Sequence, residues 1–218
     1  IHGGAGTITR ESMTPEREAQ YKAKLKEAVD AGYAILEQGG ASMDAVIAAV
    51  KILEDSPLFN AGRGAVYTWE GQHELDASIM NGATLEAGAV ASVTTVKSPI
   101  ALAREVMENS PHVMLSGAGA EMFAKQQGLD LVDNSYFNTK SRYEALQRMK
   151  EQVGNPQDKT AWQQLPEEYK HGTVGAVAVD KHGNLAAATS TGGMTGKRWG
   201  RVGDSPIIGA GTWADNSS

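Results

Sequence analysis

The chain has 218 residues, a formal net charge of −6 and no cysteine. This length suits one domain with a sizeable core, and the lack of cysteine excludes disulfides and thiolate metal sites and fits a cytoplasmic protein. The acidic balance argues against nucleic acid or an anionic membrane as the main partner. No apolar run has the length of a membrane span and no secretory signal is present, so we expect a soluble protein.

Helices separated by glycine loops are expected in the first part of the chain. Apolar residues recur at helical spacing from Leu25 to Leu36, and Gly39-Gly40 ends that helix. Ser42 is the expected N-cap of a second helix, whose apolar stripe runs from Met43 to Leu53. Ser56-Pro57 ends this helix, because a proline disfavours helix at the residue before it.

The middle of the chain combines strands, helices and a linker. The stretch from Leu75 to Val96 is rich in small and β-branched residues and predicts strands. Pro99 to Met107 and Lys140 to Val153 predict helices. From Gly154 to Gly172 the sequence has no periodicity and carries two prolines, so we expect an exposed linker there.

Two strand-like runs follow the linker, Thr173–Val179 and Leu185–Thr191. The five residues between them, 180–184, have the composition of a hairpin turn. Both runs are apolar on both faces, so the sheet that contains them is expected to be covered on both sides.

The hairpin places a second hydroxyl group beside Thr173. Folding it about His182 or Gly183 brings Thr173 opposite Thr191 or the neighbouring Gly192. Directly opposed residues have Cβ atoms roughly 4.5–5.5 Å apart. A shift of one residue in the register would turn Thr191 to the other face of the sheet.

Thr173 is a candidate nucleophile because it follows a glycine at the end of the linker. A threonine hydroxyl needs a base, and a threonine at the start of a chain has its own α-amino group for this purpose. That amine titrates near ~7.7–8.0, so a useful fraction is neutral at working pH. Cleavage between Gly172 and Thr173 would create such a residue, and glycine suits the strained peptide that cleavage needs. From local sequence alone, Thr173 could equally begin an ordinary strand.

Short motifs occur in a fixed order along nearly the whole chain. They are His2–Gly6, Pro57–Gly64, Glu74–Ala77, Ser110–Val113, Gly172–Gly175, Thr189–Gly193 and Gly200–Ser205. Together they resemble the motifs of the plant-type (type 2) L-asparaginases and isoaspartyl peptidases, which are N-terminal-nucleophile hydrolases. Each motif alone is a weak signal, whereas the ordered set is a strong one.

This resemblance implies an α/β fold, the four-layer αββα sandwich of the N-terminal-nucleophile hydrolases. It divides one domain into an α-subunit portion, residues 1–172 with the linker at about 154–172, and the start of a β-subunit portion, residues 173–218. The two portions would form an αβ heterodimer that pairs into a dimer of heterodimers. Family members continue well beyond Asp215–Ser218, so we expect the C-terminal part of the fold, with its oxyanion-hole segment, to be missing from this chain.

The resemblance also implies an activity. The precursor would cleave itself between Gly172 and Thr173, and Thr173 would then hydrolyse isoaspartyl dipeptides and L-asparagine through an acyl-enzyme. Thr191 matches the family's second threonine, and Asn60 matches an active-site asparagine near the nucleophile. Without the resemblance, Asn60 could simply cap a turn.

Arg201 and Asp204 match the family's substrate clamp. A guanidinium group can bind an α-carboxylate with two hydrogen bonds, and a carboxylate can bind an α-ammonium group. The expected substrate is therefore a small amino acid or dipeptide with a zwitterionic end. Taken alone, the two residues could form a surface ion pair.

The loop from Leu53 to Arg63 resembles one whose main-chain oxygens hold a structural sodium ion in the family. Coordination by oxygen alone suits a hard cation. The matching positions are Leu53, Glu54, Ser56, Phe59, Ala61 and Arg63. No cofactor is expected for catalysis.

Other polar residues leave alternatives open. Glu74 and Asp76 could share a strand face, as a pair of catalytic carboxylates or in a structural role. His171 and His182 flank the strand of the candidate nucleophile, and each is expected to be a solvated loop residue. Two other functions compete with the main one: a glycosylasparaginase of the same fold, and a catalytically silent precursor or fragment. The sequence has no G-x-S-x-G elbow, H-E-x-x-H helix or P-loop.

Overall fold

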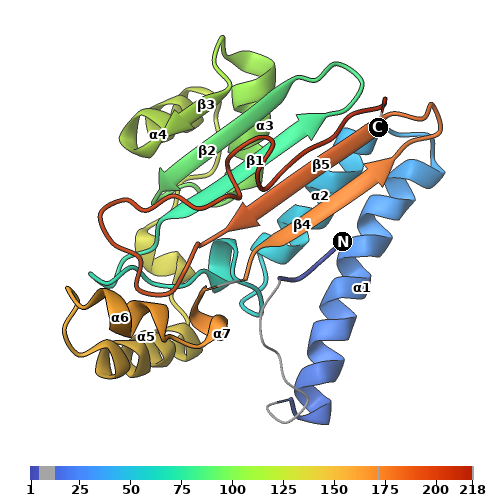
Figure 1. Ribbon diagram of the computed structural model, residues 1–218. Coiled ribbons are helices and arrows are strands. Elements are labelled where there is room, and N and C mark those ends of the chain that lie inside the picture. Colours follow the sequence, from blue (N-terminus) through green and yellow to red (C-terminus); the bar gives the residue numbers. More distant parts are fainter. Residues whose placement is uncertain (5–12, 171, 218) are drawn as a thin grey trace.

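A computed structural model describes residues 1–4, 13–170 and 172–217. Within these residues, five strands form one sheet in the order β3-β2-β1-β5-β4 (Figure 1). The strands are β1 (Leu75–Asn81), β2 (Ala87–Val93), β3 (Met114–Ser116), β4 (Val174–Val179) and β5 (Leu185–Thr191). Neighbouring strands are antiparallel except β2 and β3, which are parallel. The protein therefore has a mixed α/β architecture built on one sheet.

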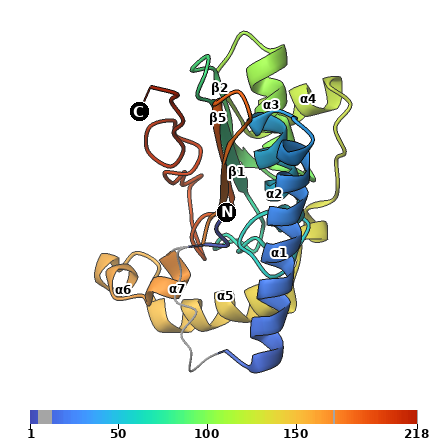
Figure 2. The ribbon, with the colours of Figure 1, turned by 90° about the vertical axis from the view of Figure 1, so that its right-hand side faces the viewer.

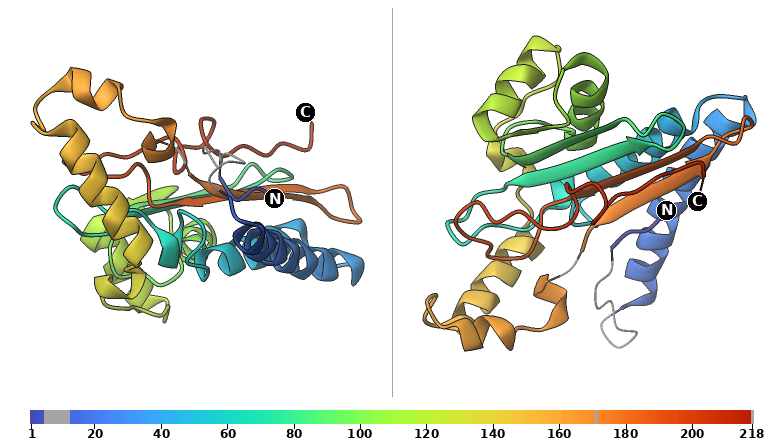
Figure 3. Two further views of the ribbon diagram at one scale, coloured as in Figure 1. Left: turned by 90° about the horizontal axis from the view of Figure 1, so that it is seen from below. Right: turned by 45° about the horizontal axis from the view of Figure 1, so that its top comes forward.

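Helices pack on one face of this sheet and at one of its ends. They are α1 (Pro15–Glu37), α2 (Ser42–Glu54), α3 (Pro99–Asn109), α4 (Gly117–Gln126), α5 (Lys140–Val153), α6 (Lys159–Gln163) and α7 (Glu167–Lys170), with 3₁₀ turns η2 (Gly62–Gly64) and η3 (Asn134–Phe137). The α2 helix packs on β4 and β5, α3 packs on β1 and β2, and α1 packs on α2 (Figure 2). The helices α5, α6 and α7 gather at the end of the sheet where β4 begins (Figure 3). No helix of the described residues is long and apolar enough to cross a membrane.

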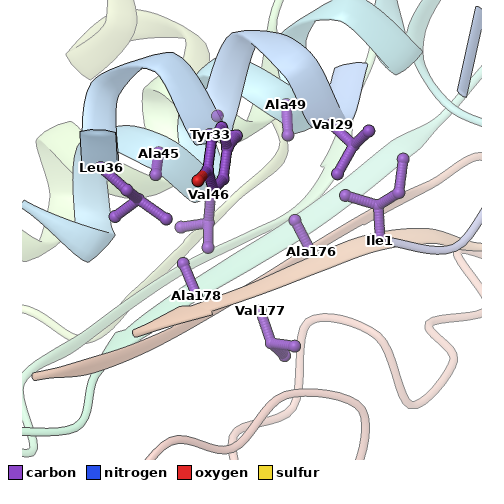
Figure 4. Close-up of a pocket in the computed structure, with 11 residues that line it drawn as sticks. Ile1, Val29, Tyr33, Leu36, Ala45, Val46, Ala49, Ala176, Val177 and Ala178 are labelled. Atoms are coloured by element: carbon purple, nitrogen blue, oxygen red, sulfur yellow. The ribbon is translucent and has the colours of Figure 1, made fainter. Parts of the chain in front are cut away.

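Side chains alternate along each strand between the face of the sheet that the helices cover and the opposite face, which we call the site face. Leu75, Ala77 and Ile79 of β1 are fully buried in the core beneath the helices. Figure 4 shows the same alternation in β4, where Ala176 lines an apolar hollow of about 100 Å³ against α1 and α2. Val177 points to the opposite side of the strand. Side chains that alternate with this core therefore lie on the site face.

The expectation of a sheet covered on both sides is confirmed at its centre, whereas the described residues leave the site face of β4 uncovered. On the site face, Met80 and Ala187 are buried by Ala214 of the C-terminal segment. At the edge of the sheet, by contrast, Val177 is 73% exposed and Val179 is 55% exposed. Valine and alanine favour a strand on either face, so their presence did not reveal which face the described chain covers.

Most predicted elements are confirmed, including α5 and β5 with the expected bounds. Ser42 is not the N-cap of α2: Ala41 occupies that position, without a side-chain hydrogen bond. Instead, the backbone N–H of Ser42 donates to Asp180 Oδ2 at 3.3 Å. The side chain of Asp180 in the hairpin turn thus accepts a hydrogen bond at the start of α2, where we expected a capping side chain from Ser42.

The linker expected at residues 154–172 contains two short helices, α6 and α7, and is not exposed throughout. Leu165 and Tyr169 are buried against Leu146 and Met149 of α5. Helices of four or five residues are too short to show a hydrophobic period, which is why the sequence indicated only a linker here. The division into α-subunit and β-subunit portions stays a prediction.

Candidate active site

The hairpin brings Thr173 and Thr191 together. Strand β4 pairs Val174 with Ser190, so the next residues along the two strands are Thr173 and Thr191. This is one of the two predicted registers, and it excludes Gly192 as the residue opposite Thr173. Ser190 contacts buried Glu54 on the helix side, so alternation places Thr191 on the site face.

A cavity of about 410 Å³ opens at this end of the sheet. Five of the predicted site residues line it: Gly172, Thr173, Thr191, Arg201 and Asp204. They come from the segment between α7 and β4, from the end of β5 and from the loop that follows β5. The structure therefore gathers the expected nucleophile and the expected clamp around one space.

Asn60 lies directly behind Gly172. A Cβ atom placed on Gly172 would be 3.1 Å from Asn60 Cβ, and the φ angle of Gly172 is +146°, a region that side chains disfavour. Asn60 Nδ2 donates to the carbonyl of Gly193 at 2.7 Å, and Asn60 Oδ1 accepts from the N–H of Val66 at 2.9 Å. Asn60 thus fixes the loop after β5 beside the Gly172–Thr173 peptide.

The Thr173 hydroxyl has a partner that the sequence did not indicate. Its Oγ1 lies 3.0 Å from Ser205 Oγ, and Ser205 is 2% exposed. The Thr191 hydroxyl accepts the N–H of Gly193 at 2.9 Å. Ser205 belongs to the Gly200–Ser205 motif, but nothing in its spacing from Thr173 predicted the contact.

His2 also lines the cavity and was not predicted as a site residue. Its backbone pairs with Gly175 of β4 through two hydrogen bonds of 2.9 and 3.1 Å. Burial lowers the pKa of the His2 imidazole below its ordinary value, although a hydrogen bond to the backbone of Thr173 acts in the opposite direction. A neutral imidazole is thus favoured beside the candidate nucleophile. Ala5 and Gly6 of the same motif lie outside the described residues.

Arg201 and Asp204 line the cavity without forming an ion pair with each other within the described part of the chain. The guanidinium group of Arg201 packs against Gly203, because its Nη1 is 2.9 Å from the position that a Cβ atom on Gly203 would occupy. Both side chains are exposed. The reading as a surface ion pair is therefore wrong, and both charges face the cavity.

Glu74 and Asp76 share a buried lysine. Lys197 Nζ lies 3.8 Å from Glu74 Oε2 and 3.8 Å from Asp76 Oδ2, and it donates to the carbonyl of Glu74 at 2.8 Å. Lys197 is 1% exposed and Asp76 is fully buried. Burial raises the pKa of Asp76, while the charges of Lys197 and Arg201 oppose that effect. The two acidic residues hence form an ion-pair network with Lys197 beside the cavity.

The two predicted loop histidines have different outcomes. His182 is exposed in the hairpin turn, where its backbone N–H donates to Asp180 Oδ1 at 2.9 Å, so it is a loop residue as expected. His171 lies outside the described residues.

The loop expected to hold a cation is tightly wound. A Cβ atom on Gly62 would lie 2.4 Å from the carbonyl oxygen of Glu54, and one on Gly64 would lie 2.0 Å from that of Phe59. Both glycines therefore pack directly against main-chain carbonyl groups, where a side chain would clash. In the described part of the chain, no group of three or more His, Cys, Asp or Glu side chains could hold a metal ion. A cation in this loop would thus depend on backbone oxygens.

A model of the asparaginase family matches residues 1–218. The chain belongs to that family. Its relatives include isoaspartyl peptidases from Salmonella typhimurium, 54% identical, and Escherichia coli, 51% identical; each match covers 100% of this chain, and 69% and 68% of the respective relative. A plant-type L-asparaginase from Pyrococcus furiosus is 46% identical over 99% of this chain and 69% of its own length. The resemblance that the motifs indicated is confirmed.

Proposed function

We propose that this asparaginase-family chain is a threonine amidohydrolase that hydrolyses isoaspartyl dipeptides and L-asparagine. The observation that supports this most is the position of Thr173, which lies between Gly172 and the start of β4 and lines a cavity that Arg201 and Asp204 also line. The names of its relatives, isoaspartyl peptidase and plant-type L-asparaginase, support the same chemistry.

The first step of the proposed mechanism is self-cleavage. Thr173 Oγ1 attacks the carbonyl carbon of Gly172, its proton passes to the departing Thr173 nitrogen, and the peptide becomes an ester. Water then hydrolyses this ester and leaves Gly172 with a carboxylate and Thr173 with a free amine. The φ angle of +146° at Gly172, which only glycine adopts easily, and the close approach of Asn60 to this position support a defined geometry at this bond.

The second step is substrate hydrolysis. The free amine of Thr173 accepts the hydroxyl proton, and Oγ1 attacks the side-chain amide carbon of asparagine or the β-linked peptide carbon of an isoaspartyl dipeptide. Ammonia or the amine of the second residue leaves with that proton, and water releases aspartate from the ester. Ser205 and Thr191 lie where their hydroxyls can orient Oγ1 and the oxygen of the attacked carbonyl.

Arg201 and Asp204 select the substrate in this proposal. The guanidinium group binds the α-carboxylate, and the Asp204 carboxylate binds the α-ammonium group. Because the two side chains do not pair with each other, both charges are available to a zwitterionic ligand.

A structural sodium ion is also proposed for the glycine-containing loop. The carbonyl oxygens of Leu53, Glu54, Ser56, Phe59, Ala61 and Arg63 would hold it, which fits the preference of a hard cation for oxygen. The ion would fix the turn from α2 into η2 and with it Asn60. It takes no part in the chemical steps.

The proposal extends to architecture. We propose that the sheet is one half of a four-layer αββα sandwich, with a second sheet that residues beyond this sequence supply. The exposed Val177 and Val179 on the site face support this, since a second sheet would bury them. We also propose that the cleaved portions remain together as an αβ heterodimer and that two heterodimers associate.

The test uses the complete protein, expressed with any residues that its gene encodes beyond Ser218. Wild type and Thr173→Ala are assayed on isoaspartyl-leucine, L-asparagine and glycosylasparagine. Hydrolysis of the first two by wild type, and none by Thr173→Ala, is the expected result. Equal turnover by both proteins would contradict the proposed nucleophile, a marked preference for glycosylasparagine would favour the rival enzyme, and no turnover by either would favour a silent protein.

A further inference from the structure

The candidate site contains a buried network that the proposed mechanism does not use. Thr173, Thr191 and Asp76 form a row across β4, β5 and β1, because Asp76 pairs with Thr191 on the other side of β5. All three side chains lie on the site face. Asp76 is therefore the direct cross-strand neighbour of Thr191, and Thr173 lies one strand further along the row.

Asp76 is incompletely satisfied. Its Oδ1 accepts the N–H of Ser92 at 2.8 Å, whereas its Oδ2 has no hydrogen-bond partner within the described residues. The nearest cation is Lys197 Nζ at 3.8 Å, which is held by the Glu74 carbonyl. A buried carboxylate with a free oxygen attracts any cation that can reach it.

Arg201 is the other cation at this place. Lys197 Nζ lies 3.2 Å, and Arg201 Nη1 lies 3.4 Å, from the position of a Cβ atom on Gly193. The ammonium and guanidinium groups therefore approach the same glycine. The charge of Arg201 acts to lower the pKa of both Lys197 and Asp76, which agrees with this proximity.

We infer that Lys197 is a positioning residue for the substrate clamp: its buried ammonium group neutralises Asp76 and Glu74, so that Arg201 stays in the cavity and available to the substrate carboxylate. This inference rests on the proposed function of Arg201. Without Lys197, the free Oδ2 of Asp76 would draw the guanidinium group inward. Repulsion between the two cations also favours the outward position of Arg201.

Kinetics of two variants test this role. Lys197→Met should raise KM for isoaspartyl-leucine by about tenfold or more, with kcat within about threefold of wild type, because binding of the α-carboxylate is lost and the nucleophile is not. Adding Asp76→Asn to Lys197→Met removes the attraction and should return KM to within about threefold of wild type. Lys26→Met, an exposed lysine on α1, is the matched control and should change neither constant.

A purely structural role for Lys197 gives a different pattern. If Lys197 were only structural, Lys197→Met would have a lower yield and a lower melting temperature, but the KM of its folded fraction would be unchanged. Alternatively, KM would rise by the same factor in Lys197→Met and in the double variant. Either kinetic result overturns the inference. If Lys197→Met does not fold, Lys197→Gln retains a donor for the Glu74 carbonyl without the charge and faces the same criteria.

The outcome separates this inference from the proposed function. Hydrolysis by wild type with an unchanged KM in Lys197→Met overturns the inference alone. No hydrolysis by wild type overturns the proposed function. In that case the binding of L-aspartate tests the inference: its Kd should rise about tenfold in Lys197→Met and return towards the wild-type value in the double variant.

Discussion

The hydroxyl oxygens of Thr173 and Ser205 lie 3.0 Å apart, although 32 positions separate them in the sequence. The chain makes this contact by returning over the site face after β5. Ser78 Oγ and Thr189 Oγ1 both donate to the carbonyl of Ser205, at 2.6 and 2.9 Å. The backbone of Ser205 is therefore anchored to β1 and β5, and its side chain is directed at the hydroxyl of Thr173, the proposed nucleophile.

Removing this hydroxyl should slow the reaction without disturbing the loop. In Ser205→Ala the two hydrogen bonds to the backbone carbonyl remain, and only the contact to Thr173 Oγ1 is lost. We expect kcat/KM for isoaspartyl-leucine to fall by about threefold to tenfold, the effect of one neutral hydrogen bond. Ser217→Ala, exposed near the C-terminal end of the described chain, is the control. An unchanged kcat/KM in Ser205→Ala would show that this hydroxyl does not orient the nucleophile.

Arg201 offers a second prediction, on binding. Arg201→Lys keeps the positive charge but loses the planar pair of donors that fits a carboxylate. KM should rise by about tenfold or more while kcat changes much less. The exposed substitution Arg17→Lys on α1 should have no effect. A fall in kcat at constant KM would instead assign Arg201 to the chemical step.

The sodium proposal predicts a salt-specific stabilisation. The melting temperature should be higher in sodium chloride than in choline chloride at equal ionic strength, because only sodium binds the loop carbonyls. Gly62→Ala should abolish this difference, since its Cβ would lie 2.4 Å from the Glu54 carbonyl oxygen. Gly39→Ala is the matched control, because Gly39 also has a positive φ and its Cβ position is open. A sodium effect that survives in Gly62→Ala would place the ion elsewhere.

Asp180 gives a prediction of how stability depends on pH. Burial alone would raise its pKa, but hydrogen bonds from the backbone N–H groups of Asn184, His182 and Ser42 outweigh burial and hold the pKa below the ordinary 3.8. A carboxyl group with a lowered pKa stabilises the fold above its unfolded pKa, and this stabilisation disappears as the pH falls through the folded pKa.

Asp180→Asn should therefore reduce the free energy of unfolding at pH 7 by about 1–3 kcal/mol. The difference from wild type should shrink as the pH falls below 3.8. Chemical denaturation at several pH values measures it, with exposed Asp30→Asn as control. If the difference in unfolding free energy between wild type and Asp180→Asn stays constant down to the acid transition, the charge of Asp180 does not contribute to stability.

Local sequence predicted the parts of this site that local structure determines. The hairpin from Val174 to Thr191 follows from two strand-like runs around a turn, and with it the position of Thr191 opposite Thr173. Ser205 and Lys197 depend on how the loop after β5 returns across the sheet, so no spacing along the chain revealed them. Lys197 in particular has the sequence context of a surface lysine, yet its side chain is fully buried.

The central claim is that Thr173 acts with a free backbone amine. Mass spectrometry of the complete protein, after chemical labelling of α-amines, tests it in a preparation whose turnover is measured in parallel. We expect two fragments, the second with a labelled Thr173 at its start, and activity in proportion to that fragment. Full activity in a preparation whose Gly172–Thr173 bond remains intact would contradict the account.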